Sequence, residues 1–207
     1  RLQVEHPVTE EVLGVDLVKM QILTAQNQFV FNSKDIRIPR GHSIECRVYA
    51  ENPYMGGMPS TGKLGRVEWP EGPRRRYEFG FDAGDTITSY YDPMIAKVIV
   101  WDEMRSRAID KMIRTLKDST VFGVHTNIPY LIEILDHEEF RSGKMTTRFI
   151  ETYFAEGLKS KTSDEQIKKW GQAVYKQMRT QGALSSANRT LHNTSGASPW
   201  SSFWRGV

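Results

Sequence analysis

The first six residues bring a cation, an amide, a carboxylate and an imidazole together, on Arg1, Gln3, Glu5 and His6. Alternate side chains of a strand share one face, so a strand over residues 1–5 would present Arg1, Gln3 and Glu5 together. This trio suits a small planar oxyanion, because guanidinium and amide donate hydrogen bonds while the carboxylate accepts a proton or binds a metal ion. From spacing alone an edge strand with a solvated Arg–Glu pair is the commoner case, and both interpretations stay open.

Two further charges lie on predicted strands. Arg47 belongs to an alternating stretch over residues 43–49, where an isolated arginine is most often a surface residue. Lys97 interrupts an apolar run over residues 94–101, so its ammonium must reach a partner or solvent. We assign no catalytic role to Lys97.

The composition describes a globular chain. Of 207 residues, 39% are hydrophobic and 26% are charged, which suits one sizeable core or one domain with an appendage. The net charge of +3 is too small and too dispersed to favour nucleic-acid or membrane partners, and no run approaches the roughly 18 apolar residues of a membrane span. The single Cys46 supports neither an intrachain disulfide nor a cysteine metal site, and it indicates a reducing compartment: the cytoplasm, or the mitochondrial matrix in a eukaryote.

The hydrophobic periodicity predicts an α+β fold, with helices at both ends and strands between them. Short strands separated by loops rich in Gly and Pro are expected to form a compact antiparallel β unit: residues 43–49, 64–69, 76–79 and 94–101. Helices should precede and cover this unit: one opening at Pro7 and interrupted at Gly14, then residues 15–25, 105–116, 128–135 and 148–154.

The domain is expected to end near residue 158. A capping box of Ser163 and Gln166 opens another predicted helix, whose apolar stripe runs to Met178. Residues 181–198 are rich in Ser, Thr, Asn, Ala and Gly and indicate a flexible connector, followed by aromatic residues over 200–204. An Arg at position 1, in place of a start Met, indicates a piece of a longer protein.

The first ten residues, Arg-Leu-Gln-Val-Glu-His-Pro-Val-Thr-Glu, closely resemble the bicarbonate-binding signature of biotin carboxylases. The resemblance continues through residues 41–47, 59–63, 90–97 and 126–127, and it covers about residues 1–158. It implies the C-terminal part of an ATP-grasp biotin carboxylase, with most of the ATP-grasp fold before Arg1. Residues 1–40 would end the ATP-grasp body, 41–158 would form the carboxylase C-terminal domain, and 159–207 would begin an inter-domain linking region.

The resemblance also implies roles for individual residues. Arg1, Gln3 and Val4 would hold bicarbonate, with Glu5 as the base that deprotonates it. Arg47 would contact the ureido oxygen of biotin and stabilise the charge that develops there.

The resemblance leaves weaker expectations elsewhere in the chain. Thr147 would lie on the ATP side, although capping of the helix near Arg148 explains it equally well. Thr126 or Asn127 is expected to cap the helix that begins at Ile128. The basic run 74–76 falls on a hairpin near the family's dimer interface, so Arg76 is expected in a subunit contact.

The implied enzyme uses ATP, with Mg²⁺ or Mn²⁺ bound mainly outside this chain, to carboxylate biotin on a carrier. Its partners would be a biotin carboxyl carrier domain, a carboxyltransferase subunit or domain, and a second copy in a homodimer. The residues after 158 resemble those of acyl-CoA carboxylase α subunits, which favours such a parent. The isolated chain is expected to be inactive. An alternative is a non-catalytic scaffold for dimerisation and docking, which would need neither Glu5 nor Arg47.

Overall fold

A computed structural model of the chain describes residues 1–28, 38–158 and 172. The chain divides into two compact units, Arg1–Leu158 and Lys159–Val207, and the helices and strands that follow belong to the first. The predicted helix after Ser163, the connector and the terminal aromatic residues lie outside the described residues, apart from Gln172.

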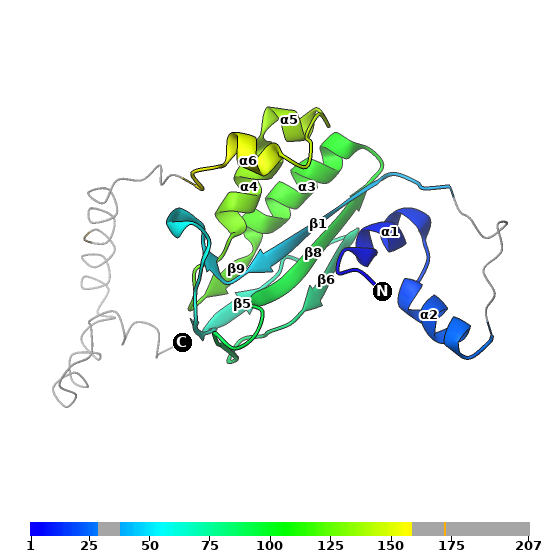
Figure 1. Ribbon diagram of the computed structural model, residues 1–207, viewed down its shortest axis with the longest axis horizontal. Coiled ribbons are helices and arrows are strands. Elements are labelled where there is room, and N and C mark those ends of the chain that lie inside the picture. Colours follow the sequence, from blue (N-terminus) through cyan, green and yellow to red (C-terminus); the bar gives the residue numbers. More distant parts are fainter. Residues whose placement is uncertain (29–37, 159–171, 173–207) are drawn as a thin grey trace. The chain divides into compact units, whose positions relative to one another are not determined.

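The centre of this unit is a three-stranded antiparallel sheet in the order β1-β8-β6 (Figure 1). Its strands are β1 (His42–Tyr49), β8 (Met94–Asp102) and β6 (Arg75–Phe79). In this register Arg47 of β1 lies opposite Lys97 of β8, and Glu78 of β6 lies opposite Lys97 on its other side. The predicted strands at these places are confirmed.

The two faces of β1 differ in character. Ile44, Cys46 and Val48 are buried in the hydrophobic core, whereas the residues between them are only half-buried. Because side chains alternate across a strand, Glu45 and Arg47 point to the face opposite the core. The period-two pattern of the sequence therefore separates a packing face from a polar face.

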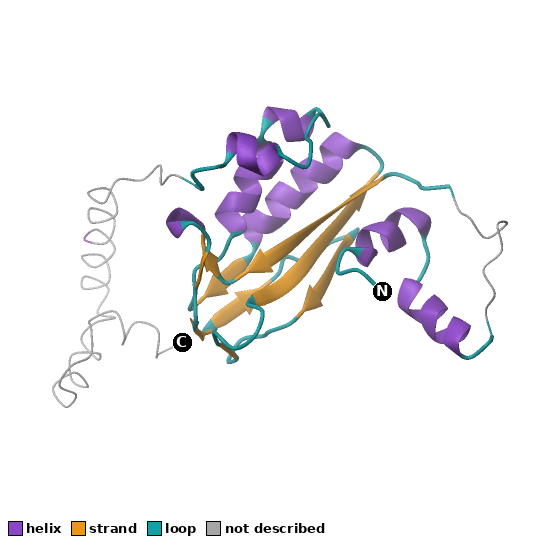
Figure 2. Cartoon of the chain, in the orientation of Figure 1, coloured by secondary structure: helices purple, strands orange, loops and turns teal. Residues whose placement is uncertain are grey.

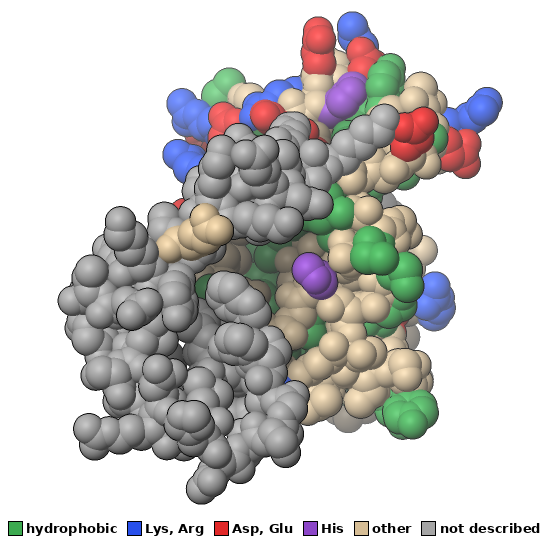
Figure 3. All heavy atoms as spheres, turned by 90° about the vertical axis from the view of Figure 1, so that its left-hand side faces the viewer, with side chains coloured by type: hydrophobic (Ala, Val, Ile, Leu, Met, Phe, Trp, Pro, Cys, Tyr) green, Lys and Arg blue, Asp and Glu red, His purple; other side chains and the backbone are tan. Residues whose placement is uncertain are grey.

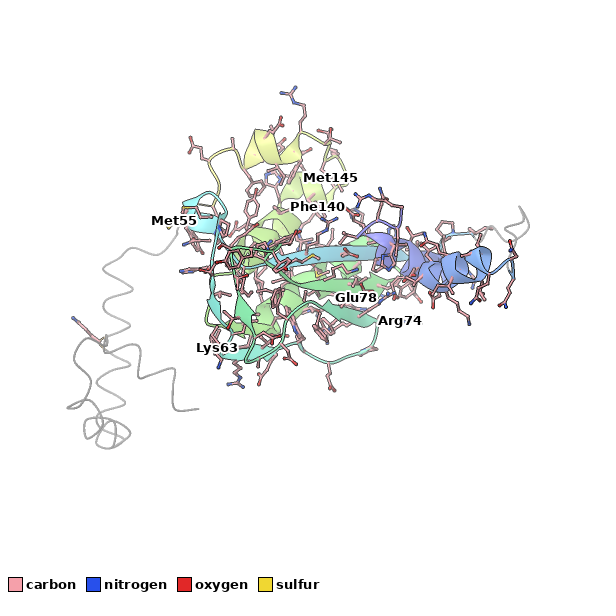
Figure 4. All side chains as sticks on the ribbon, turned by 60° about the horizontal axis from the view of Figure 1, so that its bottom comes forward. Met55, Lys63, Arg74, Glu78, Phe140 and Met145 are labelled. Atoms are coloured by element: carbon pink, nitrogen blue, oxygen red, sulfur yellow. The ribbon has the colours of Figure 1, made fainter. Side chains whose placement is uncertain are left out.

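The core face is covered by α3 (Arg105–Asp118), against which α4 (Ile128–Asp136) packs (Figures 1 and 2). The helical spacing of apolar residues buries Ala108, Ile109, Met112, Ile113 and Leu116 of α3. Two short helices follow, α5 (Glu138–Arg141) and α6 (Phe149–Tyr153). Arg105 of α3 holds this end by donating to the Phe140 carbonyl and stacking on its ring, near the labelled Met145 in Figure 4.

Short strands and a 3-10 turn lie between the longer elements of the described residues. They form three two-stranded antiparallel pairs: β2 (Glu51–Asn52) with β3 (Met58–Pro59), β4 (Gly62–Lys63) with β7 (Thr86–Ile87), and β5 (Arg66–Glu68) with β9 (Thr120–Phe122). The turn η2 (Pro53–Met55) links β2 to β3. The predicted β unit is thus antiparallel throughout the described residues, although it comprises several small sheets.

The polar face of the sheet is covered by α1 (His6–Leu13), which packs on β1 and β8 and is followed by α2 (Leu17–Ala25). Gly14 ends α1 in the left-handed conformation, with φ 63°, and the Asp16 carboxylate caps α2 by accepting from the Lys19 amide at 2.8 Å. Both predicted helices are confirmed.

The predicted strand over residues 1–5 is wrong. The His6 amide donates to the Gln3 carbonyl at 3.2 Å and closes a turn, after which α1 begins at once. Pro7 favours this start, because its missing N–H needs no partner in the first helical turn. Arg1, Gln3 and Glu5 are nevertheless all exposed, while Leu2 and Val4 between them are half-buried.

On the face drawn in Figure 3, acidic and basic side chains are interspersed at the α5–α6 end of the unit. The basic run at residues 74–76 makes contacts within the chain: Arg74 stacks on the Trp101 ring, Arg75 donates to Thr115, and Arg76 pairs with glutamates. This run therefore does not form a free cationic surface.

Candidate active site

Buried Glu10 joins α1 to the sheet and to α2. Its side chain is 6% exposed, and one carboxylate oxygen accepts from Arg76 of β6 at 2.7 Å while the other accepts from the Leu17 amide at 2.7 Å. Both oxygens of this buried charge are thus paired, so Glu10 fixes α1 over the sheet. The residues just before α1 are thereby held above the polar face.

Glu5 and Arg47 meet at this place. The Arg47 guanidinium, on β1, donates to the Glu5 carboxylate, which immediately precedes α1. The Glu5 side chain is 59% exposed and the Arg47 side chain is 34% exposed, so the pair is open to a ligand from solvent. The structure thus joins two residues that lie 42 positions apart in the sequence.

The exposed side of Glu5 opens onto a groove between the start of α1 and α2. One side of it is lined by residues at and before the start of α1, namely Arg1, Leu2, Gln3, Glu5, His6, Val8 and Thr9, and the other by residues of α2, namely Leu17, Met20, Gln21, Thr24 and Ala25. Arg1, Gln3 and Glu5 thus line one groove, although a turn leads into it in place of the predicted strand. A cation, an amide and a carboxylate at one groove can bind a planar oxyanion.

Sequence reasoning missed a second layer of charge beneath this pair. Lys97 is 9% exposed and forms an ion pair with Glu78, and its ammonium also donates to the Val4 carbonyl at 3.2 Å. Glu78, which Figure 4 labels, also forms an ion pair with Arg76. The expectation that Lys97 must reach a partner is confirmed. Its position beside residues 1–5 could not be predicted locally, because it depends on the register between β1 and β8.

Glu45 lies on the same face of β1 as Arg47. Both of its carboxylate oxygens are buried without a hydrogen-bond partner among the described residues. Burial raises the pKa of Glu45 from 4.5 to about 7, and nearby Lys97 and Arg47 counteract part of that rise. This carboxyl therefore carries only part of a negative charge at neutral pH.

Asn127 holds the backbone of β1 at Arg47. Its side chain donates to the Arg47 carbonyl at 3.1 Å and accepts from the Tyr49 amide at 2.9 Å, across the bulge in β1 after Val48. Asn127 precedes α4, as expected, but its side chain makes no cap hydrogen bond, so the predicted capping role is wrong. The Arg47 carbonyl and the Tyr49 N–H of β1 bind the Asn127 side chain in place of the first turn of α4.

Replacing Asn127 by Ala is expected to lower the free energy of unfolding by about 2–4 kcal/mol, because it removes the hydrogen bonds to the half-buried Tyr49 N–H and Arg47 carbonyl. Chemical denaturation of the chain measures this change. The matched control is Asn52→Ala, which removes an exposed side-chain bond to the Tyr54 amide and should cost about 1 kcal/mol or less. Equal losses of unfolding free energy in both variants would contradict the proposed role of Asn127 in holding the backbone of β1.

Thr147 is exposed in the turn before α6. The turn is closed by Thr146, whose hydroxyl accepts from the Arg148 amide at 3.3 Å, so capping does not account for Thr147.

Within residues 1–28 and 38–158, no group of three His, Cys, Asp or Glu side chains is arranged to hold a metal ion. No helix in the described part of the chain is long and apolar enough to cross a membrane.

The sequence matches the biotin carboxylase C-terminal domain family over residues 45–152, more than half of the chain. Biotin carboxylase from Halalkalibacterium halodurans is 43% identical over 163 residues, which cover 78% of this chain and 35% of that protein. A pyruvate carboxylase subunit from Methanothermobacter thermautotrophicus is 39% identical over 202 residues, 95% of this chain and 41% of the relative.

A solved structure has the same fold. It is the biotin carboxylase domain dimer of 2-oxoglutarate carboxylase from Hydrogenobacter thermophilus, in complex with MgADP, ADP and bicarbonate. It is 45% identical, covers 74% of this chain and 34% of that chain, and superposes with a TM-score of 0.70. The chain spans about a third of the length of the curated relatives it matches. By sequence and by fold, the chain belongs to the biotin carboxylase C-terminal domain family.

Proposed function

We propose that the chain is the C-terminal part of a biotin carboxylase and contributes bicarbonate and biotin contacts to the ATP-dependent carboxylation of carrier-bound biotin. The observation that carries the proposal is the Glu5–Arg47 ion pair beside a groove that Arg1 and Gln3 also line. An exposed ion pair stabilises a fold by only about 0–1 kcal/mol, so stability gives little reason for this arrangement. The non-catalytic scaffold is therefore the weaker alternative.

In this proposal Arg1, Gln3 and the Val4 amide hold bicarbonate, and Glu5 accepts its proton. A guanidinium suits two oxygens of a planar anion, and a carboxylate in reach of the third completes the site. Arg47 stabilises negative charge on the ureido oxygen of biotin, which a permanent cation does without any proton transfer. Because Arg47 contacts Glu5, the bicarbonate side and the biotin side adjoin one another.

The remaining parts of the proposal concern the longer protein. Residues 1–40 end an ATP-grasp body, 41–158 form the C-terminal domain, and 159–207 begin a linking region. ATP with Mg²⁺ or Mn²⁺ binds mainly outside this chain, with exposed Thr147 on the ATP side. The partners are a biotin carboxyl carrier domain, a carboxyltransferase and a second copy. An acyl-CoA carboxylase parent stays a prediction, because the relatives include carboxylases of 2-oxo acids.

The test is ATP cleavage by the full-length protein that carries this chain. Phosphate release should depend on both bicarbonate and biotin, and radiolabel from bicarbonate should appear in an acid-labile product. The isolated 207-residue chain should give neither signal, because it spans only about a third of its relatives. Bicarbonate-dependent ATP cleavage by the isolated chain, or bicarbonate-independent cleavage by the full-length protein, would contradict the proposal.

A further inference from the structure

Lys97 is a buried charge to which neither the sequence motif nor the proposed reaction assigns a role. It lies in the middle of β8, between Arg47 on one neighbouring strand and Glu78 on the other. Directly opposed residues of antiparallel strands share a face, so all three side chains lie on the polar face beneath α1. There the Lys97 ammonium contacts the Glu78 carboxylate and the Val4 carbonyl.

The segment before α1 is therefore attached to the sheet at two consecutive residues. Lys97 donates to the backbone carbonyl of Val4, at 3.2 Å, and Arg47 donates to the side chain of Glu5. The Val4 carbonyl and the Glu5 amide belong to one planar peptide unit, so holding the oxygen fixes the plane from which the Glu5 side chain starts. Lys97 and Arg47, which lie opposite each other in the sheet, thus hold the Val4 carbonyl and the Glu5 side chain.

Packing alone does not account for a lysine at this position. Its neighbours Ala96 and Val98 are fully buried, and burial of an ammonium costs more free energy than burial of an apolar chain of similar size. Glu78 offsets that cost and is itself held by Arg76, which also binds Glu10 of α1. The whole network thus places the ammonium under the Val4 carbonyl.

We propose that Lys97 is a positioning residue for bicarbonate: by holding the Val4 carbonyl, it orients the Val4–Glu5 peptide against Arg47. The inference rests on the proposed function, since it assigns to Lys97 a part in the same site. Lys97 acts through Val4 and Glu5 and does not itself touch bicarbonate. It follows that loss of the ammonium should weaken bicarbonate binding more than ATP binding.

The experiment compares Lys97→Met with Lys111→Met in the full-length carboxylase. Lys111 is a matched control: it also joins a backbone carbonyl, that of Trp101 at 2.8 Å, to a carboxylate, that of Asp102, and it is similarly buried. Its contacts lie at the far end of β8, away from Val4. Both variants should lose thermal stability, whereas only Lys97→Met should raise the KM for bicarbonate, by about ten-fold or more.

The KM for ATP should stay within about two-fold in both variants, and Lys97→Arg, which keeps the charge and donors, should recover part of the bicarbonate affinity. If Lys97→Met does not fold, the same KM is measured for Lys97→Gln. The glutamine amide lies one bond closer to the backbone than the lysine ammonium and still donates to Glu78. A bicarbonate KM equal to that of wild type or of Lys111→Met would overturn the inference. A wild-type protein without bicarbonate-dependent ATP cleavage would instead overturn the proposed function.

Discussion

Glu5→Gln is expected to reduce bicarbonate-dependent ATP cleavage by the full-length protein by about 10²–10⁴-fold, the range that a positioned general base contributes. The amide keeps the size of the side chain and can still accept a hydrogen bond from Arg47, but it cannot take a proton from bicarbonate. Steady-state phosphate release at saturating bicarbonate measures the loss, and binding of ATP should be unchanged.

The matched control for Glu5→Gln is Glu11→Gln. Glu11 lies on α1 and contacts Arg76 at 3.7 Å, so it has the same side chain and a similar partner, away from the groove. This variant should keep nearly wild-type turnover. Wild-type rates in Glu5→Gln would remove Glu5 as the base, and equal losses in the two variants would point to damage of α1 as a whole.

The exposed Glu5–Arg47 pair also separates catalysis from stability. With side chains 59% and 34% exposed, the pair contributes no more than about 1 kcal/mol to folding. Glu5→Gln should therefore leave the melting temperature nearly unchanged while turnover collapses. A scaffold role predicts the opposite order, with stability or dimerisation affected and turnover preserved.

The sequence predicts the main sheet and helices well, because each has a strong local pattern. Ile44, Cys46 and Val48 alternate with polar residues and identify β1, and a helical stripe from Ala108 to Leu116 identifies α3. Such periodicity reflects burial of one face, which the chain encodes residue by residue. The two-residue strands have no periodicity of their own, so β2, β3, β4 and β7 could not be predicted.

The site itself is predicted only in part, because its second layer depends on long-range register. Nothing local to Lys97 shows that it lies opposite Arg47 and beneath Val4. Asn127 has an equally misleading local context: its place before a helix suggests a cap, whereas it bonds to β1 residues about 80 positions earlier. Residues 1–5 misled in the other direction, since their alternation indicated a strand, whereas they form a turn that leads into the helix predicted at Pro7.

Gly123 illustrates a signal that the sequence contains but that only the structure explains. Its φ is 114°, and a Cβ there would lie 2.0 Å from the Lys63 carbonyl oxygen. Only glycine permits this close approach of two backbones. Four residues later in the chain, Asn127 donates to the Arg47 carbonyl.

Arg47→Ala is expected to slow carboxylation of biotin by about 10²–10³-fold, the loss typical of removing one donor that stabilises developing negative charge. The affinity for ATP should change little, because the Arg47 side chain contacts Glu5 and Tyr49, and neither is assigned to the ATP side. Transfer of label from bicarbonate to free biotin measures the first quantity, and equilibrium nucleotide binding measures the second. Equal losses in both would contradict the assigned role.

Arg66→Ala is the matched control for Arg47→Ala, because Arg66 is also a strand arginine paired with a glutamate, Glu68, and lies on β5 outside the groove. It should retain nearly full activity. Arg47→Lys should recover only part of the rate of biotin carboxylation. An ammonium has one nitrogen, whereas the planar guanidinium can donate from two nitrogens at once.

The contact between Arg47 and Glu5 makes one further outcome specific. If both residues act in one unit, the double variant Glu5→Gln with Arg47→Ala should be only slightly slower than the worse single variant, because each replacement already disables that unit. Independent roles would instead multiply the two losses. The double-mutant cycle therefore tests whether the bicarbonate side and the biotin side of the site are joined through this ion pair.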